Sequence, residues 1–274
     1  MPDRPRLAGV LGRPIEHSLS PVLHNAAYTA LGLPWQYQAQ DCGVVDLSGV
    51  LAERADWAGF SLTMPLKRAA LEQAVQASSR ARAVGAANTL LPVDGGGWRA
   101  DNTDVQGVLG ALAEASCRPS TATLLGAGGT AQAALVALAE LGLRECAVLV
   151  RDTGRTVDLQ ATAAAAGVTL RLGELTVAAP ELGAGLVVST LPAGAADGLA
   201  VAPWRSDQTL LDVVYAPWPT ALAAAVSASG GAVLSGALML LHQAMAQVEL
   251  MTGRAAPAAA MRAALAAAAP DAGL

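Results

Sequence analysis

The sequence predicts an α/β fold in which strands and helices alternate along most of the chain. Two observations carry this prediction. The stretch Thr121–Arg155 shows an apolar β-prone segment, a glycine turn, an apolar helical repeat and a second strand in succession. On both sides of it, short β-prone runs are separated by helical ones. Because strands joined through helices pair in parallel, we expect largely parallel sheets that are buried on both faces.

The glycine turn of this stretch has the spacing of a dinucleotide-binding motif. Residues Gly126–Ala131 read GAGGTA, which fits G-x-G-x-x-G/A. In such a turn Gly126 permits the tight bend, Gly128 lets the backbone approach a pyrophosphate, and Ala131 lets helix and strand pack closely. The N–H groups that begin the helix then face the anion. A glycine-rich turn that binds nothing is the plainer interpretation.

The end of the second strand indicates which dinucleotide binds. The strand runs into Arg151 and Asp152, and Arg155 follows four residues after Arg151. Two guanidiniums at this spacing can bind a 2′-phosphate through charge-assisted hydrogen bonds, whereas a carboxylate accepts from a ribose 2′-hydroxyl. The arginine pair therefore favours NADP, and Asp152 beside it is the argument for NAD.

Composition narrows the classes of function. The chain has 274 residues, enough for one large or two ordinary domains, and its net charge of −5 provides no basic face for nucleic acid. No apolar run approaches the roughly eighteen residues that span a bilayer, and the start lacks the apolar core of a signal peptide, so we expect a cytoplasmic protein. The three cysteines and three histidines are scattered, and they predict neither a disulfide framework nor a metal site.

A pair of serines precedes the first predicted helix. Ser20 is placed to cap a helix that begins at Pro21 and ends before Gly32. A cap explains Ser20 alone and leaves Ser18 without a role. Two hydroxyls beside a helix N-terminus can bind a small carboxylate with the help of the helix dipole.

Two charged residues also occupy the starts of predicted helices. Lys67 precedes a helix predicted for residues 68–77, and the positive end of the helix dipole disfavours a cation there. A residue that breaks a local rule is a functional candidate. Asp104 lies in the first turn before an apolar run at 105–112, where a carboxylate suits the dipole. We place a domain change at Asp104.

The remaining elements follow the same alternation. We expect strands at residues 7–11, 35–40, 58–62, 168–172, 186–189, 209–214 and 231–234, and a turn followed by a strand within 85–91. Helices are expected at 45–54, after 155, at 219–227, from 236 and at 257–268.

Taken together, six short motifs resemble the shikimate dehydrogenase family. In chain order they are SLSPxxHN from Ser18, TMPLK from Thr63, GAANT from Gly85, DNTD from Asp101, GAGGTA from Gly126 and MLxxQA from Met239. The resemblance covers nearly the whole chain. It departs from the family pattern at Ser61, where many relatives carry Asn, at Val105, where Gly is common, and at residues 150–152, where Asn-Arg-Thr is usual.

The resemblance implies two domains and a reaction. A substrate-binding catalytic domain would comprise residues 1–103 plus 237–274, with a Rossmann dinucleotide-binding domain, 104–236, inserted between them. The implied reaction is the reversible NADPH-dependent reduction of 3-dehydroshikimate to shikimate, a step of chorismate and aromatic amino acid biosynthesis. The implied assembly is a monomer or a homodimer.

The resemblance also implies roles for individual residues. Lys67 and Asp104 would form the catalytic pair. The substrate contacts would be Ser18, Ser20, Thr63, Lys67, Asn88, Asp104, Tyr215 and Gln243. The NADP contacts would be Gly126, Ala127, Gly128, Gly129, Thr130, Arg151, Asp152, Arg155, Thr190, Leu191, Val213, Gly236 and Met239.

Two alternatives keep parts of this interpretation. A quinate or aminoshikimate dehydrogenase using NAD or NADP would share the fold, but relatives that accept quinate tend to carry Thr where this chain has Ser20. A non-catalytic NADP-binding regulatory protein would not need the acid/base pair of Lys67 and Asp104.

Overall fold

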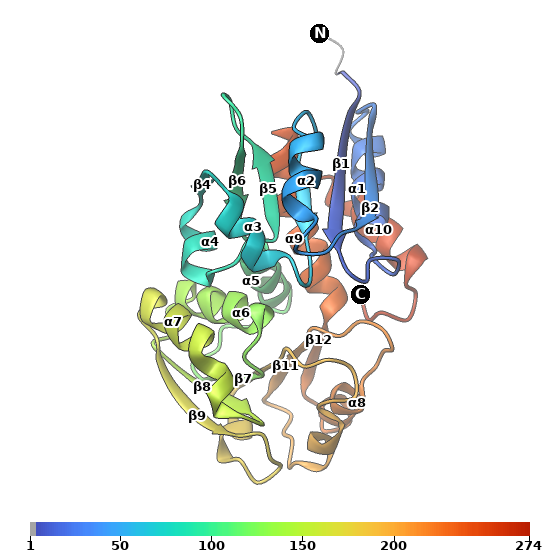
Figure 1. Ribbon diagram of the computed structural model, residues 1–274. Helices are drawn as coiled ribbons and strands as arrows, with labels where there is room; N and C mark the ends of the chain where they lie inside the picture. Colours follow the sequence, from blue (N-terminus) through green and yellow to red (C-terminus); the bar gives the residue numbers. More distant parts are fainter. Residues whose placement is uncertain (1–3) are drawn as a thin grey trace. The chain divides into compact units, whose positions relative to one another are not determined.

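Two six-stranded sheets organise residues 4–274, the part of the chain that the computed structural model describes (Figure 1). Each sheet belongs to its own unit. The first unit comprises the described residues up to Thr103 together with Gln243–Ala269, and the second comprises Asp104–His242 with Pro270–Leu274. The chain thus leaves the first unit at Asp104 and re-enters it in the middle of a helix. Within these described residues, no helix is both long and apolar enough to cross a membrane.

The first sheet has the strand order β2-β1-β3-β5-β6-β4. Strands β1, β2 and β3 pair in parallel, as expected, whereas β5 is antiparallel to both β3 and β6. A short glycine turn joins β5 to β6, and such a turn allows only antiparallel pairing. The strands are β1 (Arg6–Gly12), β2 (Trp35–Asp41), β3 (Phe60–Leu62), β4 (Gln76–Ala77), β5 (Thr89–Pro92) and β6 (Trp98–Asp101).

Helices flank this sheet and bury its apolar side chains. One core cluster includes Phe60, Leu66 and Leu90, and another includes Tyr28 and Tyr37. Helix α10 packs against α1. The helices of this unit are α1 (Ser20–Ala30), α2 (Leu47–Glu53), α3 (Lys67–Gln73), α4 (Ser79–Val84), the latter part of α9 (Gly236–Thr252), and α10 (Ala258–Ala268).

Helix α3 is shorter than the sequence predicts. The expected helix over 68–77 ends at Gln73, and Ala74 is already extended, with φ −79° and ψ 135°. The N–H of Val75 donates to the carbonyl of Trp98 at 2.9 Å, and β4 then pairs with β6. The main chain of β6 therefore competes successfully with helix propensity, which is a weak preference.

The second sheet is entirely parallel, with the order β12-β11-β10-β7-β8-β9. Counted from β7, this is the 3-2-1-4-5-6 order of dinucleotide-binding folds. Strands β7 and β10 are buried along their whole length, which confirms the expectation of two covered faces at the sheet centre. The strands are β7 (Ala122–Leu125), β8 (Glu145–Val150), β9 (Thr169–Glu174), β10 (Leu186–Ser189), β11 (Thr209–Asp212) and β12 (Ala232–Ser235).

Helices cover this sheet in sequence order. Helix α6 contacts β7, α7 contacts β9, and α8 contacts β11 and β12, as can be followed in Figure 1. The helices are α5 (Asp104–Glu114), α6 (Gly129–Glu140), α7 (Val157–Ala166) and α8 (Ala221–Ala228), with short 3₁₀ turns at Thr153–Thr156, Pro180–Gly183 and Asp197–Val201.

The start of α9 packs main chain against main chain. A methyl group at Gly236 would lie 1.9 Å from the carbonyl oxygen of Val213, which follows β11. Heavy atoms cannot approach so closely, and the obstacle is backbone rather than a movable side chain. Only glycine therefore fits at this position.

We expect Gly236→Ala to lower the free energy of unfolding by at least about 2 kcal/mol, because the backbone of β11 or α9 must shift to admit the methyl group. Gly49→Ala in α2 is the matched control, since a methyl group there meets nothing within 4 Å. Helix propensity should make that control neutral or stabilising by up to about 1 kcal/mol. Urea denaturation of both variants measures the difference, and equal stabilities would contradict the packing argument.

Candidate active site

Main-chain hydrogen bonds bring three of the predicted motifs to one end of the first sheet. The N–H of Leu62 donates to the carbonyl of Asn88 at 2.7 Å, and the N–H of Asn88 donates to Asp101 at 3.1 Å. The N–H of Ala87 donates to the carbonyl of Lys67 at 2.8 Å. The segments around Thr63–Lys67, Asn88 and Asp101–Thr103 are therefore neighbours, and Lys67, which is half-buried, begins α3.

The serine pair lies at the start of α1, but the predicted cap is wrong. Helix α1 begins at Ser20 itself, and Leu19 occupies the N-cap position without a side-chain hydrogen bond. The Ser18 hydroxyl instead accepts from the N–H of Ser20 at 3.4 Å. The N–H of Ser18 donates to the carbonyl of Ile15 at 3.0 Å, in the turn that precedes the helix.

Asn88 is held in this region by several hydrogen bonds, and it is 2% exposed. Its Oδ1 accepts from the N–H of Thr103 at 2.7 Å and from the hydroxyl of Thr89 at 2.9 Å. Its Nδ2 donates to the Thr103 hydroxyl at 3.0 Å and to Gln243 Oε1 at 3.4 Å. Two predicted substrate contacts, Asn88 and Gln243, are thus joined directly, and Asp104 follows Thr103 in the chain.

Gln247 is a further residue of this site that none of the sequence motifs includes. It lies one helical turn after Gln243 and is fully buried. Its Nε2 donates to the carbonyl of Asn88 at 3.2 Å and to the hydroxyl of Thr89 at 3.0 Å. Its Oε1 accepts from Ser61 at 2.8 Å. Two glutamines at i and i+4 share one helix face, and this spacing is the signal that could have revealed the second.

His24 closes the same network from α1. Its Nε2 lies 3.2 Å from Gln247 Oε1, and its ring stacks on Tyr37 with centroids 3.9 Å apart. Tyr37 donates its hydroxyl proton to Ser61. Because an amide oxygen only accepts, Nε2 carries the proton of neutral His24, and Nδ1 has no partner. Burial lowers the pKa of His24 to about 3.

In the second unit, the predicted coenzyme residues lie at the carboxyl ends of the strands. Gly126 follows β7 with φ +100°, and a methyl group on it would lie 2.8 Å from the hydroxyl of Thr190, after β10. Gly128 is the N-cap of α6, and a methyl group there would meet nothing within 4 Å. The protein's own packing therefore requires Gly126 but not Gly128. Leu191, Val213 and Gly236 follow β10, β11 and β12, and Met239 lies in α9.

A buried carboxylate shapes the loop that carries Tyr215. Asp212 Oδ1 accepts from the N–H of Val214 at 3.2 Å, and Oδ2 accepts from the Thr220 hydroxyl at 2.8 Å. Burial raises the pKa of Asp212 and also that of the half-buried Tyr215. Asp212 thus ties both ends of this loop to β11.

The residues after β8 form an exposed turn. Asp152 Oδ1 accepts from the N–H of Gly154 at 2.9 Å, and the carbonyl of Asp152 accepts from the N–H of Arg155 at 3.2 Å. The carboxylate therefore caps the 3₁₀ turn that sets Arg155 one turn from Arg151. All three predicted side chains, Arg151, Asp152 and Arg155, are solvent-exposed.

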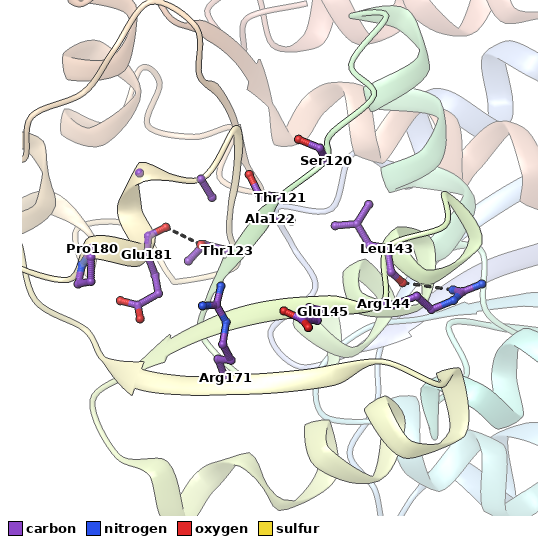
Figure 2. A pocket seen from close by; sticks show the side chains of 12 residues that line it. Ser120, Thr121, Ala122, Thr123, Leu143, Arg144, Glu145, Arg171, Pro180 and Glu181 are labelled. Atoms are coloured by element: carbon purple, nitrogen blue, oxygen red, sulfur yellow. Dashed lines mark hydrogen bonds between the residues drawn. The ribbon is translucent and has the colours of Figure 1, made fainter.

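A separate cavity of about 460 Å³ lies at the opposite edge of the second sheet (Figure 2). It is lined by Thr121, Thr123, Glu145 and Arg171, among others, near the amino ends of β7 and β8. Ligands of such sheets bind outside the carboxyl ends of the strands, so this cavity is not the candidate coenzyme site. Among residues 4–274, no group of three or more His, Cys, Asp or Glu could hold a metal ion.

Comparison with known proteins identifies the family. Residues 10–90 match the shikimate dehydrogenase substrate binding domain, and residues 236–266 match the shikimate 5′-dehydrogenase C-terminal domain. The shikimate dehydrogenase (NADP(+)) of Methylobacterium radiotolerans is 39% identical over 258 residues, which cover 90% of this chain and 91% of that protein. The chain belongs to the shikimate dehydrogenase family.

Solved structures of the family have the same fold. The shikimate dehydrogenase of Mycobacterium tuberculosis superposes with a TM-score of 0.86 at 47% identity, covering 96% of this chain and 100% of that one. The shikimate 5-dehydrogenase of Thermus thermophilus, solved with NADP(H) and shikimate, superposes with a TM-score of 0.83 at 34% identity, covering 96% and 99%. The family resemblance of the six motifs and the predicted α/β fold are confirmed.

The buried histidine predicts how stability depends on pH. The pKa of His24 is about 3 in the folded protein against 6.5 in the unfolded chain, so the unfolded state binds the proton first and stability falls as pH drops below about 6.5. Between about pH 7.5 and pH 5 the loss from this group is about 2 kcal/mol. We expect His24→Phe to remove that part of the pH dependence in urea denaturation. An unchanged pH dependence would show that His24 protonates within the folded state.

Proposed function

We propose that the protein catalyses the reversible reduction of 3-dehydroshikimate to shikimate by NADPH, a step of chorismate and aromatic amino acid biosynthesis. The observation that carries the proposal is a 39% identity to a shikimate dehydrogenase (NADP(+)) over 90% of the chain. A match over 90% of the chain includes residues of both units. The local geometry supports it, because Lys67, Asn88 and Gln243 come from distant segments and are held around one sheet end.

The substrate residues of the proposal come from several segments. Ser18 and Ser20 bind the carboxylate of the substrate through neutral donors at the start of α1, where the helix dipole favours an anion. Amide groups recognise the ring hydroxyls, since they offer both donors and acceptors. The remaining contacts are Thr63, Lys67, Asn88, Asp104, Tyr215 and Gln243.

Reduction of a ketone needs a proton at the developing alkoxide, and we assign that step to Lys67. The bound nicotinamide supplies the hydride. The ammonium of Lys67 stabilises the negative charge on oxygen and then delivers the proton, and in oxidation its amine takes the proton back. Asp104 orients the ammonium and balances its charge.

The coenzyme residues fit a dinucleotide with a 2′-phosphate. The backbone has open space at Gly128, and a pyrophosphate can approach the N–H groups of α6 there. Arg151 and Arg155 hold the 2′-phosphate, which favours NADP, and the carboxylate of Asp152 stays with the Gly154 N–H. The full set proposed is Gly126, Ala127, Gly128, Gly129, Thr130, Arg151, Asp152, Arg155, Thr190, Leu191, Val213, Gly236 and Met239.

The proposal is tested by following nicotinamide absorbance with shikimate or quinate, each with NADP or NAD. We expect the largest kcat/KM for shikimate with NADP, because Arg151 and Arg155 favour the 2′-phosphate and Ser20 favours shikimate. A larger kcat/KM with quinate would identify the quinate-using alternative. No reduction with any pair would leave the non-catalytic NADP-binding protein.

Lys67→Ala should lower kcat by roughly a hundredfold or more, the usual cost of removing a positioned acid/base group, with a smaller change in KM for shikimate. Asp104→Asn should also slow turnover, because the lysine loses its charge partner. Ser18→Ala is the contrasting variant, since it should act mainly on KM. Steady-state kinetics separate the two effects, and near-normal turnover in Lys67→Ala would exclude the assigned role.

A further inference from the structure

We propose that Gln247 is a positioning residue of the substrate site, which acts through Thr89 to fix the orientation of Asn88 without touching the substrate. The inference rests on the proposed function, in which Asn88 contacts the substrate. Gln247 lies on α9, far along the chain from Asn88, and it matches none of the six family motifs. Its role follows from the direction of each hydrogen bond around it.

The hydrogen-bond partners of Gln247 fix the orientation of its side-chain amide. The group 3.2 Å from the carbonyl oxygen of Asn88 must be a donor, because a carbonyl oxygen only accepts. Nε2 therefore faces Asn88 and also donates to the Thr89 hydroxyl at 3.0 Å. Gln247 is 0% exposed, so water cannot replace either bond.

The hydroxyl of Thr89 connects the Gln247 amide to the side chain of Asn88. The Thr89 hydroxyl accepts from Gln247 and gives its own proton to Asn88 Oδ1 at 2.9 Å. The N–H of Thr103 donates to the same oxygen at 2.7 Å. With these donors on Oδ1, the amide nitrogen of Asn88 is turned to the other side, towards the Thr103 hydroxyl and Gln243.

The oxygen of the Gln247 amide, Oε1, faces hydrogen-bond donors, as this orientation requires. Oε1 accepts from the Ser61 hydroxyl at 2.8 Å, and it lies 3.2 Å from Nε2 of His24. Ser61 is free to donate in this direction because it accepts from Tyr37. Ser61 is 4% exposed and both its donor and an acceptor position are used inside the protein, so it supports Gln247 rather than the substrate.

This relay matters because the two orientations of an asparagine amide have nearly the same shape but opposite hydrogen-bonding character. A flipped Asn88 would exchange the positions of its donor and its acceptor at the proposed substrate contact. Gln247, Thr89 and Ser61 each use a donor and an acceptor inside the protein, and buried polar groups that are satisfied in this way specify one arrangement. The relay from Gln247 through Thr89 thus acts together with the Thr103 N–H to hold Asn88 in one orientation.

The sharpest test uses two substitutions of Thr89. Thr89→Val keeps the shape but removes the hydroxyl, whereas Thr89→Ser keeps the hydroxyl. We expect Thr89→Val to raise KM for shikimate about tenfold, the change that corresponds to one lost hydrogen bond, with a smaller change in kcat. Thr89→Ser should restore KM towards the wild-type value, because the relay is intact.

Gln247→Met should raise KM for shikimate in the same way, with the KM for NADP unchanged. Gln208→Met is the matched control. Gln208 is 2% exposed, its Nε2 donates to the carbonyls of Leu182 and Ala184, and its Oε1 accepts from the N–H of Arg205. Its loss should lower the melting temperature comparably and leave the KM for shikimate unchanged.

A normal KM for shikimate in folded Thr89→Val would overturn the relay, and so would an equal rise of KM in Gln208→Met. Should Gln247→Met fail to fold, the Thr89 pair decides alone. A wild-type protein without dehydrogenase activity would refute the proposed function instead. In that case the inference is tested by NMR on the side-chain amide signals of Asn88. These signals are assigned by their loss in Asn88→Asp. These signals must shift in Thr89→Val and not in Thr89→Ser, and unshifted signals would overturn it.

Discussion

The main-chain carbonyl oxygen of Asn88 holds a strand and a helix of the first unit together at the end of its sheet. It accepts from the N–H of Leu62 at 2.7 Å and from Nε2 of Gln247 at 3.2 Å. The first bond extends the pairing of β3 and β5 to the candidate site. The second bond attaches α9 to the same end of the sheet. A single buried acceptor thus joins segments from both ends of the described chain, and the side chain of Asn88 is placed by that backbone.

The second unit depends on a different constraint, the tight packing around two glycines at the carboxyl ends of its strands. Gly126 has φ +100° and leaves no room for a side chain beside Thr190, and Gly236 leaves none beside Val213. Both glycines follow strands of one parallel sheet, and their loops therefore meet at the same edge. Gly126 and Gly236 are therefore required by the packing of the protein itself. At Gly128 the space beside the backbone is open, so a ligand can approach it.

Much of this organisation could be predicted because it depends on local pattern. The GAGGTA turn, the apolar repeat after it and the arginines after β8 belong to one continuous stretch, and the strand and helix of that stretch appear where the pattern puts them. The prediction that Ser20 caps this helix is wrong, because the helix begins at Ser20 and Leu19 occupies the N-cap position. The prediction that residues 76–77 are helical is also wrong, because their pairing with β6 outweighed helix propensity.

The sequence by itself determined the alternation of strands and helices, the dinucleotide motif and the family, because periodicity, turn chemistry and motif spacing are properties of neighbouring residues. Only the tertiary structure decided that Gln247, Thr89 and Ser61 share a network with His24, because residues from α9, β5, β3 and α1 meet only when the sheet and helices pack. The direction of each hydrogen bond there follows from which groups are buried together. That information exists in the folded arrangement of the chain and not in any single stretch of it.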